Sequence, residues 1–268
     1  MEQAEISIAM GVYNPQPELL ERCIRSLIRQ RFTAWELVLY NDGSGPDHTR
    51  EVRRAAGMDP RILCLEGEEN RGLAYALNLC IRHSRAPYIA RMDADDEALP
   101  DRLTEEHALL EQEKQYSWVG SWALLTDRNG VWGTRRVPEM PRTEDFLFNS
   151  PFIHPSVLFR REALETAGGY RTDRKLRLLE DYDLFMRLYR SGLRGYNIQH
   201  PLLRYHEDRD ALRRRTYSRR IREARLRLEG FRSLGILRAE TLPYVVKPLV
   251  AGLIPAGIRH AADRYFNR

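Results

Sequence analysis

The chain contains no run of about 20 consecutive apolar residues, which is the length that a membrane-spanning helix requires. Its first residues also lack the basic stretch followed by an apolar stretch that marks a secretory signal. The three cysteines, Cys23, Cys64 and Cys80, lie far apart and without metal-ligand spacing. We therefore expect buried thiols in a reducing compartment and predict a cytoplasmic protein.

Two widespread phosphate-binding motifs are absent as well. No G-x-G-x-x-G follows the first apolar strand, and no G-x-x-x-x-G-K-[ST] occurs anywhere in the chain. These absences argue against a Rossmann dinucleotide site and a P-loop. With 268 residues and 43% hydrophobic residues, the chain can nevertheless bury a sizeable core, and disorder is not expected.

Positive charge is concentrated late in the sequence. Residues 207–238 contain eleven arginines and five acidic residues, whereas the whole chain carries a net charge of only +5. The rest of the chain is therefore close to neutral. A basic segment of this kind can face nucleic acid, anionic lipid or only water.

Strand-like and helix-like stretches alternate through the first hundred residues. The expected strands cover residues 6–13, 35–40, 61–65 and 88–92, and helical apolar spacing fills the intervals between them. This alternation predicts an α/β fold with a doubly wound, mostly parallel sheet and helices on both faces. Around the Asn-Gly at residues 129–130, the pattern predicts a β-hairpin.

Three of these strands end in residues that suit a ligand. Tyr13, Asp42 and Asp93 should meet at the carboxyl edge of the sheet, where open α/β sheets bind their ligands. An aromatic ring, an isolated acid and an acidic cluster together suit a nucleotide diphosphate. The turn at residues 41–45 has an equally simple structural interpretation, because Asn, Asp, Gly and Ser are common turn residues.

The fourth strand runs directly into three carboxylates, those of Asp93, Asp95 and Asp96. Carboxylates this close repel each other unless a cation lies between them, and Mg²⁺ and Mn²⁺ prefer such oxygen ligands. The cluster therefore indicates a divalent metal site, with a solvated acidic turn as the alternative.

In combination, the motifs are far more specific than any one of them. The chain resembles the family 2 glycosyltransferases of the GT-A fold over about residues 4–206. The resemblance is carried by residues 12–14, 41–44, 70–74 with Asn78, 92–96, 151–161, 168–170 and 179–184. It implies a GT-A domain over residues 1–206, with a nucleotide-binding half of about 1–100 and an acceptor-binding half of about 101–206.

For the donor, the resemblance implies a UDP-sugar and a divalent cofactor, Mn²⁺ or Mg²⁺. Asp42 would read the uracil base. The nucleotide-sugar pocket would be completed by Val12, Tyr13, Asn14, Arg71, Asp93 and Ala94. Asp95 would ligate the metal, and Asp93 would contact either the ribose or the metal. The role of Asp96 is left open.

Glu180 and Asp181 precede a helical apolar stripe, so they lie at the amino end of a helix. Acids at this position can simply compensate the helix dipole. The resemblance implies a second role: Asp181 would be the base of an inverting transfer, and Glu180 its neighbour. An exchange of the two roles is the main alternative.

Three further side chains are candidates for the same site. His206 is expected to supply a third metal or diphosphate ligand, with His200 as its competitor. His154 and Trp122 are candidate acceptor contacts, although core packing is the commoner role for such residues.

Residues 207–268 form a predicted helical extension, first basic and then apolar. Such a pair can lie on an anionic membrane surface, and packing on the domain or a homodimer contact is the alternative. We thus expect a peripheral position on the inner face of the membrane.

Taken together, the sequence predicts an inverting, metal-dependent hexosyl- or N-acetylhexosaminyltransferase. Its acceptor would be a glycan or a lipid-linked oligosaccharide in polysaccharide, capsule or O-antigen synthesis, and nucleic acid is not expected as a partner. The alternatives are a sugar nucleotidylyltransferase, and a non-catalytic module that binds membrane or nucleic acid through its arginines.

Overall fold

The structure is a computed structural model that describes residues 3–207 and 217–253. Its centre is a nine-stranded mixed sheet with the order β3-β2-β1-β4-β8-β6-β9-β5, and β7 pairs with β6 outside this path. The strands are β1 (Ile6–Val12), β2 (Trp35–Asn41), β3 (Ile62–Glu66), β4 (Tyr88–Arg91), β5 (Glu97–Ala98), β6 (Trp118–Asp127), β7 (Gly130–Arg135), β8 (Leu158–Arg160) and β9 (Gly195–His206).

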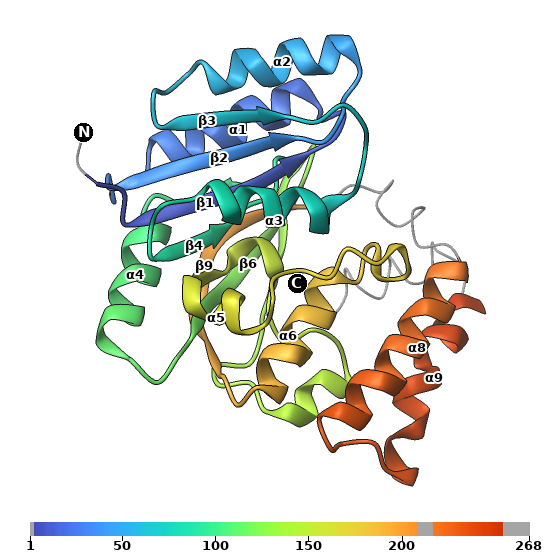
Figure 1. The fold of residues 1–268 in the computed structure, drawn as a ribbon. Coiled ribbons are helices and arrows are strands. Elements are labelled where there is room, and N and C mark those ends of the chain that lie inside the picture. The colour runs from blue at the N-terminus through green and yellow to red at the C-terminus, as the bar shows by residue number, and fades with distance from the viewer. Residues whose placement is uncertain (1–2, 208–216, 254–268) are drawn as a thin grey trace.

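Helices cover both faces of this sheet, as Figure 1 shows. The α-helices of the described residues are α1 (Pro17–Ile28), α2 (Pro46–Ala56), α3 (Leu73–His83), α4 (Arg102–Gln112), α5 (Arg161–Thr166), α6 (Glu180–Arg190), α8 (Tyr217–Ser233) and α9 (Leu242–Leu253). Of these, α8 and α9 lie apart from the sheet, on the side of α6. The predicted α/β class, with its flanking helices and C-terminal helices, is therefore confirmed.

The first four strands in the sheet order are parallel to one another, because β1 pairs in parallel with β2 and β4, and β2 with β3. The second half of the sheet is mixed. β8 runs antiparallel to both β4 and β6, while β9 runs parallel to β6. The hairpin expected around residues 129–130 is present as β6 and β7.

Strand β1 shows why the sheet has a core on each face. Ile6, Ile8 and Met10 pack with the buried residues of α1 and α2, whereas Ala9 belongs to the cluster that includes α3 and α6. Alternate residues of a strand point to opposite faces, so this one strand contributes to both cores.

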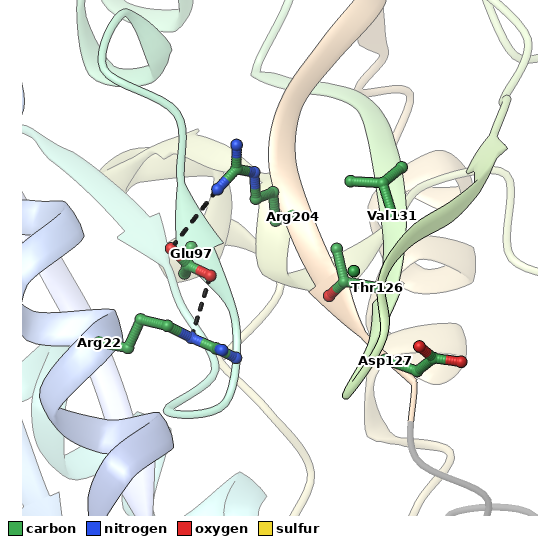
Figure 2. A pocket seen from close by; sticks show the side chains of 7 residues that line it. Arg22, Glu97, Thr126, Asp127, Val131 and Arg204 are labelled. Atoms are coloured by element: carbon green, nitrogen blue, oxygen red, sulfur yellow. Dashed lines mark ion pairs between the residues drawn. The ribbon is translucent and has the colours of Figure 1, made fainter.

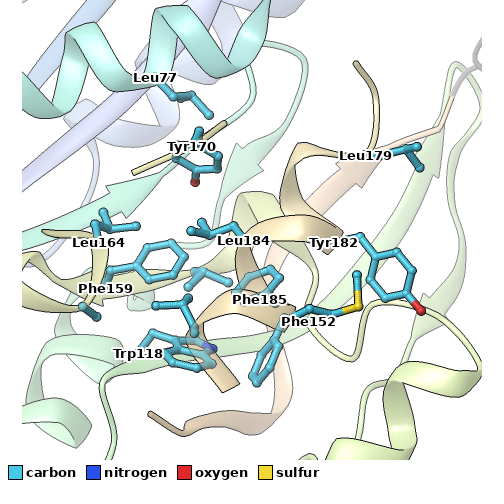
Figure 3. Close-up of a cluster of buried hydrophobic side chains, with 14 of the residues drawn as sticks. Leu77, Trp118, Phe152, Phe159, Leu164, Tyr170, Leu179, Tyr182, Leu184 and Phe185 are labelled. Carbon is cyan, nitrogen blue, oxygen red and sulfur yellow. The ribbon is translucent and has the colours of Figure 1, made fainter. Parts of the chain in front are cut away.

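The second cluster is largely aromatic and lies beneath the acceptor half of the predicted domain (Figure 3). Trp118 is fully buried against Phe152, Phe159 and Phe185, at ring-centroid distances of 5.4–6.3 Å. Edge and tilted contacts of this kind add to the stabilisation from area burial. They anchor α6, which carries the predicted base at its amino end.

The C-terminal helices pack against this same half. Leu226, Phe231, Ile236 and Val245 all belong to the buried cluster that contains α6. Arg227 is also buried, and its guanidinium donates hydrogen bonds to the carbonyls of Leu147 and Tyr244. In the part of the chain that the structure describes, no helix has both the length and the apolar character to cross a membrane. The stretches 208–216 and 254–268 of the predicted extension lie outside the described residues.

Candidate active site

The ends of β1 and β2 are joined by a set of hydrogen bonds that shape the predicted base pocket. The backbone N–H of Asp42 donates to the carbonyl of Val12 at 2.8 Å. Asn14 has a φ of 45°, donates its N–H to Ser44 Oγ and accepts from the N–H of Gly45 through its side chain. Tyr13 is 51% exposed at this edge, free to contact a ligand. The structure thus brings Val12, Tyr13, Asn14 and Asp42 together, as expected.

Asp42 is buried, and its carboxylate accepts hydrogen bonds from the chain that leads into α3. The donors are the backbone N–H groups of Arg71, at 3.0 and 3.1 Å, and of Gly72, at 2.7 Å. Asp42 therefore holds the end of β2 against the start of α3, a structural role beside the predicted reading of the base. The exposed Arg71 guanidinium lies 3.8 Å from the centre of the Tyr75 ring, at the mouth of the helix.

The three carboxylates after β4 converge as predicted. Asp93, Asp95 and Asp96 each offer an oxygen, and these oxygens lie within 4.8 Å of one another. Asp95 is exposed, Asp93 is half-buried and Asp96 is buried, with the half-buried Ala94 between them. The turn therefore presents one acidic group that could hold a metal ion.

The surroundings of the Asp96 carboxylate show whether these residues fit a cation. Its Oδ1 accepts a hydrogen bond from the N–H of His206 at 2.8 Å, but its buried Oδ2 has no hydrogen-bond partner among the described residues. Burial, and then the charges of Asp95 and Asp93, raise the pKa of Asp96 well above its usual range. A buried carboxylate oxygen without a donor, beside two further carboxylates, fits a hard divalent cation.

His206 ends β9 directly beside this cluster, through the hydrogen bond of its backbone to Asp96. Its ring is not a member of the three-carboxylate group. His200, its competitor, is exposed in the middle of β9, where its Nε2 lies 2.8 Å from a carboxylate oxygen of Glu105. The placement of the two histidines therefore favours His206 for the predicted ligand role.

A cavity of about 300 Å³ opens next to β5, with Glu97, the residue after Asp96, in its lining (Figure 2). Glu97 lies in its wall and forms ion pairs with Arg22 at 3.0 Å and with Arg204 at 3.8 Å. Because the two arginines share one carboxylate, they brace β5 against α1 and β9. The cavity is thus a neighbour of the acidic turn, formed by residues other than the predicted ligands.

On the acceptor side, Glu180 and Asp181 begin α6 as predicted. Glu180 is buried, and its carboxylate accepts the N–H of Leu179 at 2.8 Å, while Asp181 is half-buried. Burial raises the pKa of both carboxyl groups above their ordinary values, and for Glu180 the charge of Asp181 adds to this. A raised pKa suits a group that must accept a proton near neutral pH.

His154 is buried, and its Nε2 lies 2.7 Å from the hydroxyl of Tyr170. Burial lowers the pKa of His154 well below its usual range, so the ring is neutral. Tyr170 is held in turn by Asn78, whose side chain bonds both the N–H and the carbonyl of Tyr170. His154 is therefore a buried residue that contacts Tyr170.

Trp122, the other candidate acceptor contact, is half-buried on β6. Its indole N–H donates to the carbonyl of Val137 at 3.0 Å, and the Arg136 guanidinium lies 5.5 Å from the ring centre. These contacts give Trp122 a structural role in the second half of the sheet.

Two residues of the site were not singled out from the sequence, Arg91 and Tyr170. Arg91 is buried at the end of β4 and forms an ion pair with Asp93. Burial, and then the charges of Asp181, Glu180 and Asp93, raise the pKa of the Tyr170 hydroxyl, and the charge of Arg91 lowers it. An arginine within an apolar strand is a signal that could have revealed it, because a buried charge requires a partner. Tyr170 carries no comparable signal.

The fold and the site define an α/β protein with an acidic group able to hold a metal at its sheet edge and a second acidic pair at the start of α6. The family model of glycosyl transferase family 2 matches residues 7–168, and the chain belongs to this family. The resemblance noted from the motifs is therefore confirmed, and family membership argues against the nucleotidylyltransferase and the non-catalytic module.

Two of the related chains come from bacteria. EpsE of Bacillus subtilis (strain 168), assigned as a glycosyltransferase, is 36% identical over 267 residues, covering 98% of this chain and 95% of EpsE. The amylovoran biosynthesis glycosyltransferase AmsE of Erwinia amylovora is 29% identical over 214 residues, covering 78% of this chain and 79% of AmsE.

Solved structures share the GT-A-like fold. The mannosyltransferase of Pyrobaculum calidifontis, in complex with GDP-Man and Mn²⁺, has a TM-score of 0.66 at 20% identity, covering 99% of this chain and 81% of that chain. TarS 1–349 of S. aureus, in complex with UDP-GlcNAc, has a TM-score of 0.61 at 16% identity, covering 94% and 80%.

Proposed function

We propose that the protein is an inverting, metal-dependent glycosyltransferase that transfers a hexosyl or N-acetylhexosaminyl group from a UDP-sugar to a glycan or lipid-linked acceptor. The observation that carries the proposal is the group of three carboxylates after β4, those of Asp93, Asp95 and Asp96, whose oxygens lie within 4.8 Å of one another. A second acidic pair, Glu180 and Asp181, begins α6. One group suits the leaving diphosphate and the other suits the attacking hydroxyl.

The residues divide the reaction between them. The carboxylate of Asp181 takes the proton of the acceptor hydroxyl while the oxygen of that hydroxyl attacks the anomeric carbon. The bond from the anomeric carbon to the diphosphate oxygen breaks at the same time. Asp95, with Asp93, Asp96 or His206, would hold the divalent ion, which supplies charge stabilisation for the departing diphosphate. Asp42, Val12, Tyr13 and Asn14 would hold the nucleoside, and Arg71 at the start of α3 would contact a phosphate or a sugar hydroxyl.

The likeness to structures with UDP-GlcNAc and with GDP-Man makes the nucleotide the first question to test. UDP-Glc, UDP-Gal, UDP-GlcNAc and GDP-Man are each incubated with the protein and Mn²⁺ or Mg²⁺. Thermal shift and release of the nucleoside diphosphate are then measured. We expect a UDP-sugar to stabilise the protein and turn over only with metal. The proposal fails if no nucleotide sugar binds, or if Asp95→Ala binds and turns over the donor as well as the wild type does.

Names of the related proteins support a role in polysaccharide synthesis, since AmsE is described as an amylovoran biosynthesis enzyme. The stereochemistry is tested with a short lipid-linked acceptor and the donor found in the screen. Proton NMR of the first product should show the anomeric configuration opposite to that of the donor. A product with the donor's configuration would exclude the inverting mechanism.

We also propose a peripheral membrane contact on the cytoplasmic side through the C-terminal helices. Leu242, Val246 and Val250 are 46–58% exposed and follow one another at intervals of four residues along α9, so they share one face. Exposed Arg225 and Arg232 on the adjacent α8 would favour anionic lipid. A homodimer stays a prediction.

A further inference from the structure

We propose that Arg91 is a positioning residue for transfer, whose buried guanidinium holds Asp93 and provides a fixed positive charge between the donor-side and acceptor-side carboxylates. This inference rests on the proposed function and assigns a role to a residue that the motifs leave out. In this role, Arg91 keeps Asp93 away from the cation, so that Asp95 and Asp96 ligate it.

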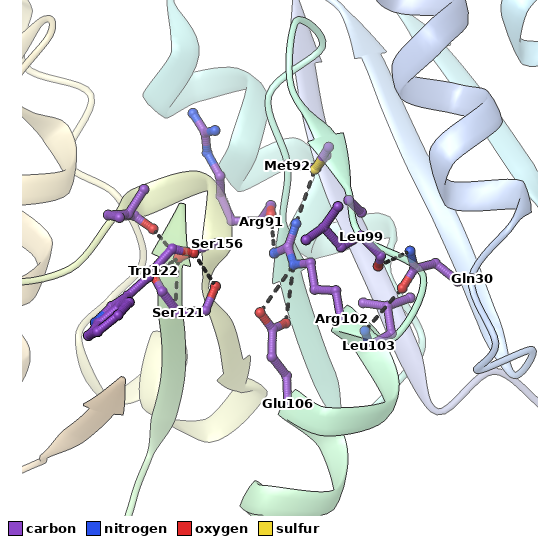
Figure 4. A network of polar contacts seen from close by, with 12 residues as sticks. Gln30, Arg91, Met92, Leu99, Arg102, Leu103, Glu106, Ser121, Trp122 and Ser156 are labelled. Atoms are coloured by element: carbon purple, nitrogen blue, oxygen red, sulfur yellow. Dashed lines mark hydrogen bonds and ion pairs between the residues drawn. The ribbon is translucent and has the colours of Figure 1, made fainter. Parts of the chain in front are cut away.

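The surroundings of Arg91 show that it is fixed in place. It is 3% exposed, and its backbone N–H donates to the carbonyl of Val157 at 2.8 Å. Its own carbonyl accepts a hydrogen bond from the Arg102 guanidinium at 2.9 Å (Figure 4). The backbone of Arg91 is therefore held on both sides.

The side chain of Arg91 faces carboxylates. It forms an ion pair with Oδ2 of Asp93, and its Nε is buried without a hydrogen-bond partner among the described residues. Its charge also acts on the buried Asp96 and Glu180 and on the half-buried Asp181. Among the described residues, no backbone carbonyl accepts a hydrogen bond from the buried Nε or Nη1 of Arg91, so the ion pair with Asp93 is the contact that fixes the guanidinium.

Elementary electrostatics explains why such a charge is needed. Five carboxylates, at residues 93, 95, 96, 180 and 181, gather in one partly buried region. Like charges a few ångströms apart repel strongly where water is excluded. The buried Arg91 offsets this repulsion when no cation is bound. When the cation is bound, Arg91 keeps Glu180 and Asp181 from being drawn towards the cation.

The ion pair also separates the roles of the three aspartates. A carboxylate oxygen held by a guanidinium is a poorer ligand than one without a donor. Oδ2 of Asp96 has no hydrogen-bond partner among the residues described, whereas Oδ2 of Asp93 has Arg91. The structure therefore assigns Asp96, whose role the motifs leave open, to the cation, and assigns Asp93 to Arg91.

The test measures Mn²⁺ binding by electron paramagnetic resonance, without nucleotide and without any reaction. Arg91→Met removes a positive charge near the cation, and we expect Mn²⁺ to bind on the order of tenfold more tightly. Asp93→Asn leaves Arg91 uncompensated and should weaken binding by a similar factor. The double variant, Arg91→Met with Asp93→Asn, restores the charge balance and should bind Mn²⁺ about as the wild type does.

Three further variants complete the design. Asp96→Asn should lose Mn²⁺ binding far more severely than Asp93→Asn. Arg91→Lys keeps the charge and should bind Mn²⁺ like the wild type. Arg161→Met is the matched control, because Arg161 is a half-buried arginine bonded to the carbonyls of Ala86 and Ile81. It should leave Mn²⁺ binding unchanged.

A second readout concerns the acceptor side. Asp181 is faced by Glu180 on its own helix, by Arg91 on β4, by Tyr170 and by Arg219 on α8. Removing the charge of Arg91 should shift the acidic limb of the transfer–pH profile to higher pH. It should also slow transfer at least about 100-fold, because the site loses its alignment. Arg91→Lys should retain the wild-type limb.

The proposal is overturned if Arg91→Met leaves the Mn²⁺ affinity unchanged or weakens it while the variant is folded. It is also overturned if the double variant binds no better than Asp93→Asn, because Asp93 would then be a ligand. Should Arg91→Met not fold, the double variant and Arg91→Lys still decide the question. If the wild type itself neither binds Mn²⁺ nor turns over a nucleotide sugar, the proposed function fails instead.

Discussion

Replacing Asp181 by Asn tests the division of labour at the start of α6. The change keeps the shape of the side chain but removes the group that is proposed to accept the proton. General-base catalysis contributes about 10²–10⁴-fold in rate, which corresponds to about 3–5 kcal/mol of the activation free energy. We expect transfer to fall by that factor, while binding of the nucleotide sugar is retained within a few-fold.

The pH dependence and the stability of the same variant follow from the raised pKa of Asp181. Burial raises the pKa of Asp181, so the wild-type transfer rate should fall as the pH drops through this raised pKa. The Asp181→Asn variant should not show this fall in rate at low pH.

The stability of the variant should change as well. In the folded state the carboxyl group of Asp181 holds its proton to higher pH than in the unfolded chain. The ionised form therefore destabilises the fold above that pKa, so Asp181→Asn should raise the melting temperature at pH 8.

Two neighbouring acids are matched controls. Glu180→Gln keeps an oxygen that can accept from Leu179, and we expect a loss of about tenfold or less. Asp183 is buried and paired with Arg187 at 2.7 Å, so Asp183→Asn should lower stability by about 3 kcal/mol and leave the rate constant of the folded enzyme unchanged. If Glu180→Gln is the more damaging of the two active-site changes, the roles of Glu180 and Asp181 are exchanged. If Asp181→Asn abolishes donor binding, Asp181 is not the base.

Three further predictions concern a turn near the site, a buried glutamate and the exposed face of α9. Gly43→Ala should destabilise the fold by about 1–3 kcal/mol in urea unfolding, because φ is 71° and the new Cβ would lie 2.5–2.8 Å from the Glu69 backbone. Burial raises the pKa of Glu106 to about 7, so stability should decline from pH 5 to pH 8, by about 3 kcal/mol, and Glu106→Gln should remove this decline. Val246→Ser with Val250→Ser should reduce flotation with anionic liposomes, whereas Leu63→Ser, an exposed apolar residue of β3, should not; equal flotation would exclude the α9 contact.

Much of the first half of the fold could be predicted from the sequence, because β1, β2 and β3 pair through consecutive strand–helix–strand units, and β4 then crosses back to lie beside β1. The second half could not be ordered in this way. β8 lies between β4 and β6, and β9 pairs with both β6 and β5, so these pairings join distant parts of the chain. Hydrophobic alternation shows that such segments are strands, but it carries no information about which strands become neighbours.

In the site, too, groupings of residues close in the sequence could be predicted, and contacts between distant residues could not. Asp93, Asp95 and Asp96 follow one strand, so their grouping was visible in the sequence. That Asp96 is buried and bonded to the backbone of His206 depends on a contact across 110 positions. The pairing of Arg91 with Asp93 is local, yet only the burial of β4 reveals that this arginine faces the acids of α6.

The packing of α8 has a consequence for how the protein can be shortened. The guanidinium of Arg227 lies 5.3 Å from the centre of the Tyr182 ring, and Leu226 and Phe231 are buried against the same aromatic layer. Burying one such apolar side chain stabilises a fold by about 1.5–3 kcal/mol. A chain cut after residue 207 would leave Tyr182 uncovered on the helix that begins with Glu180 and Asp181. Helices α8 and α9 are therefore part of the packed fold, and only substitutions on the exposed face of α9 can test the proposed membrane contact without uncovering the helix that carries Glu180 and Asp181.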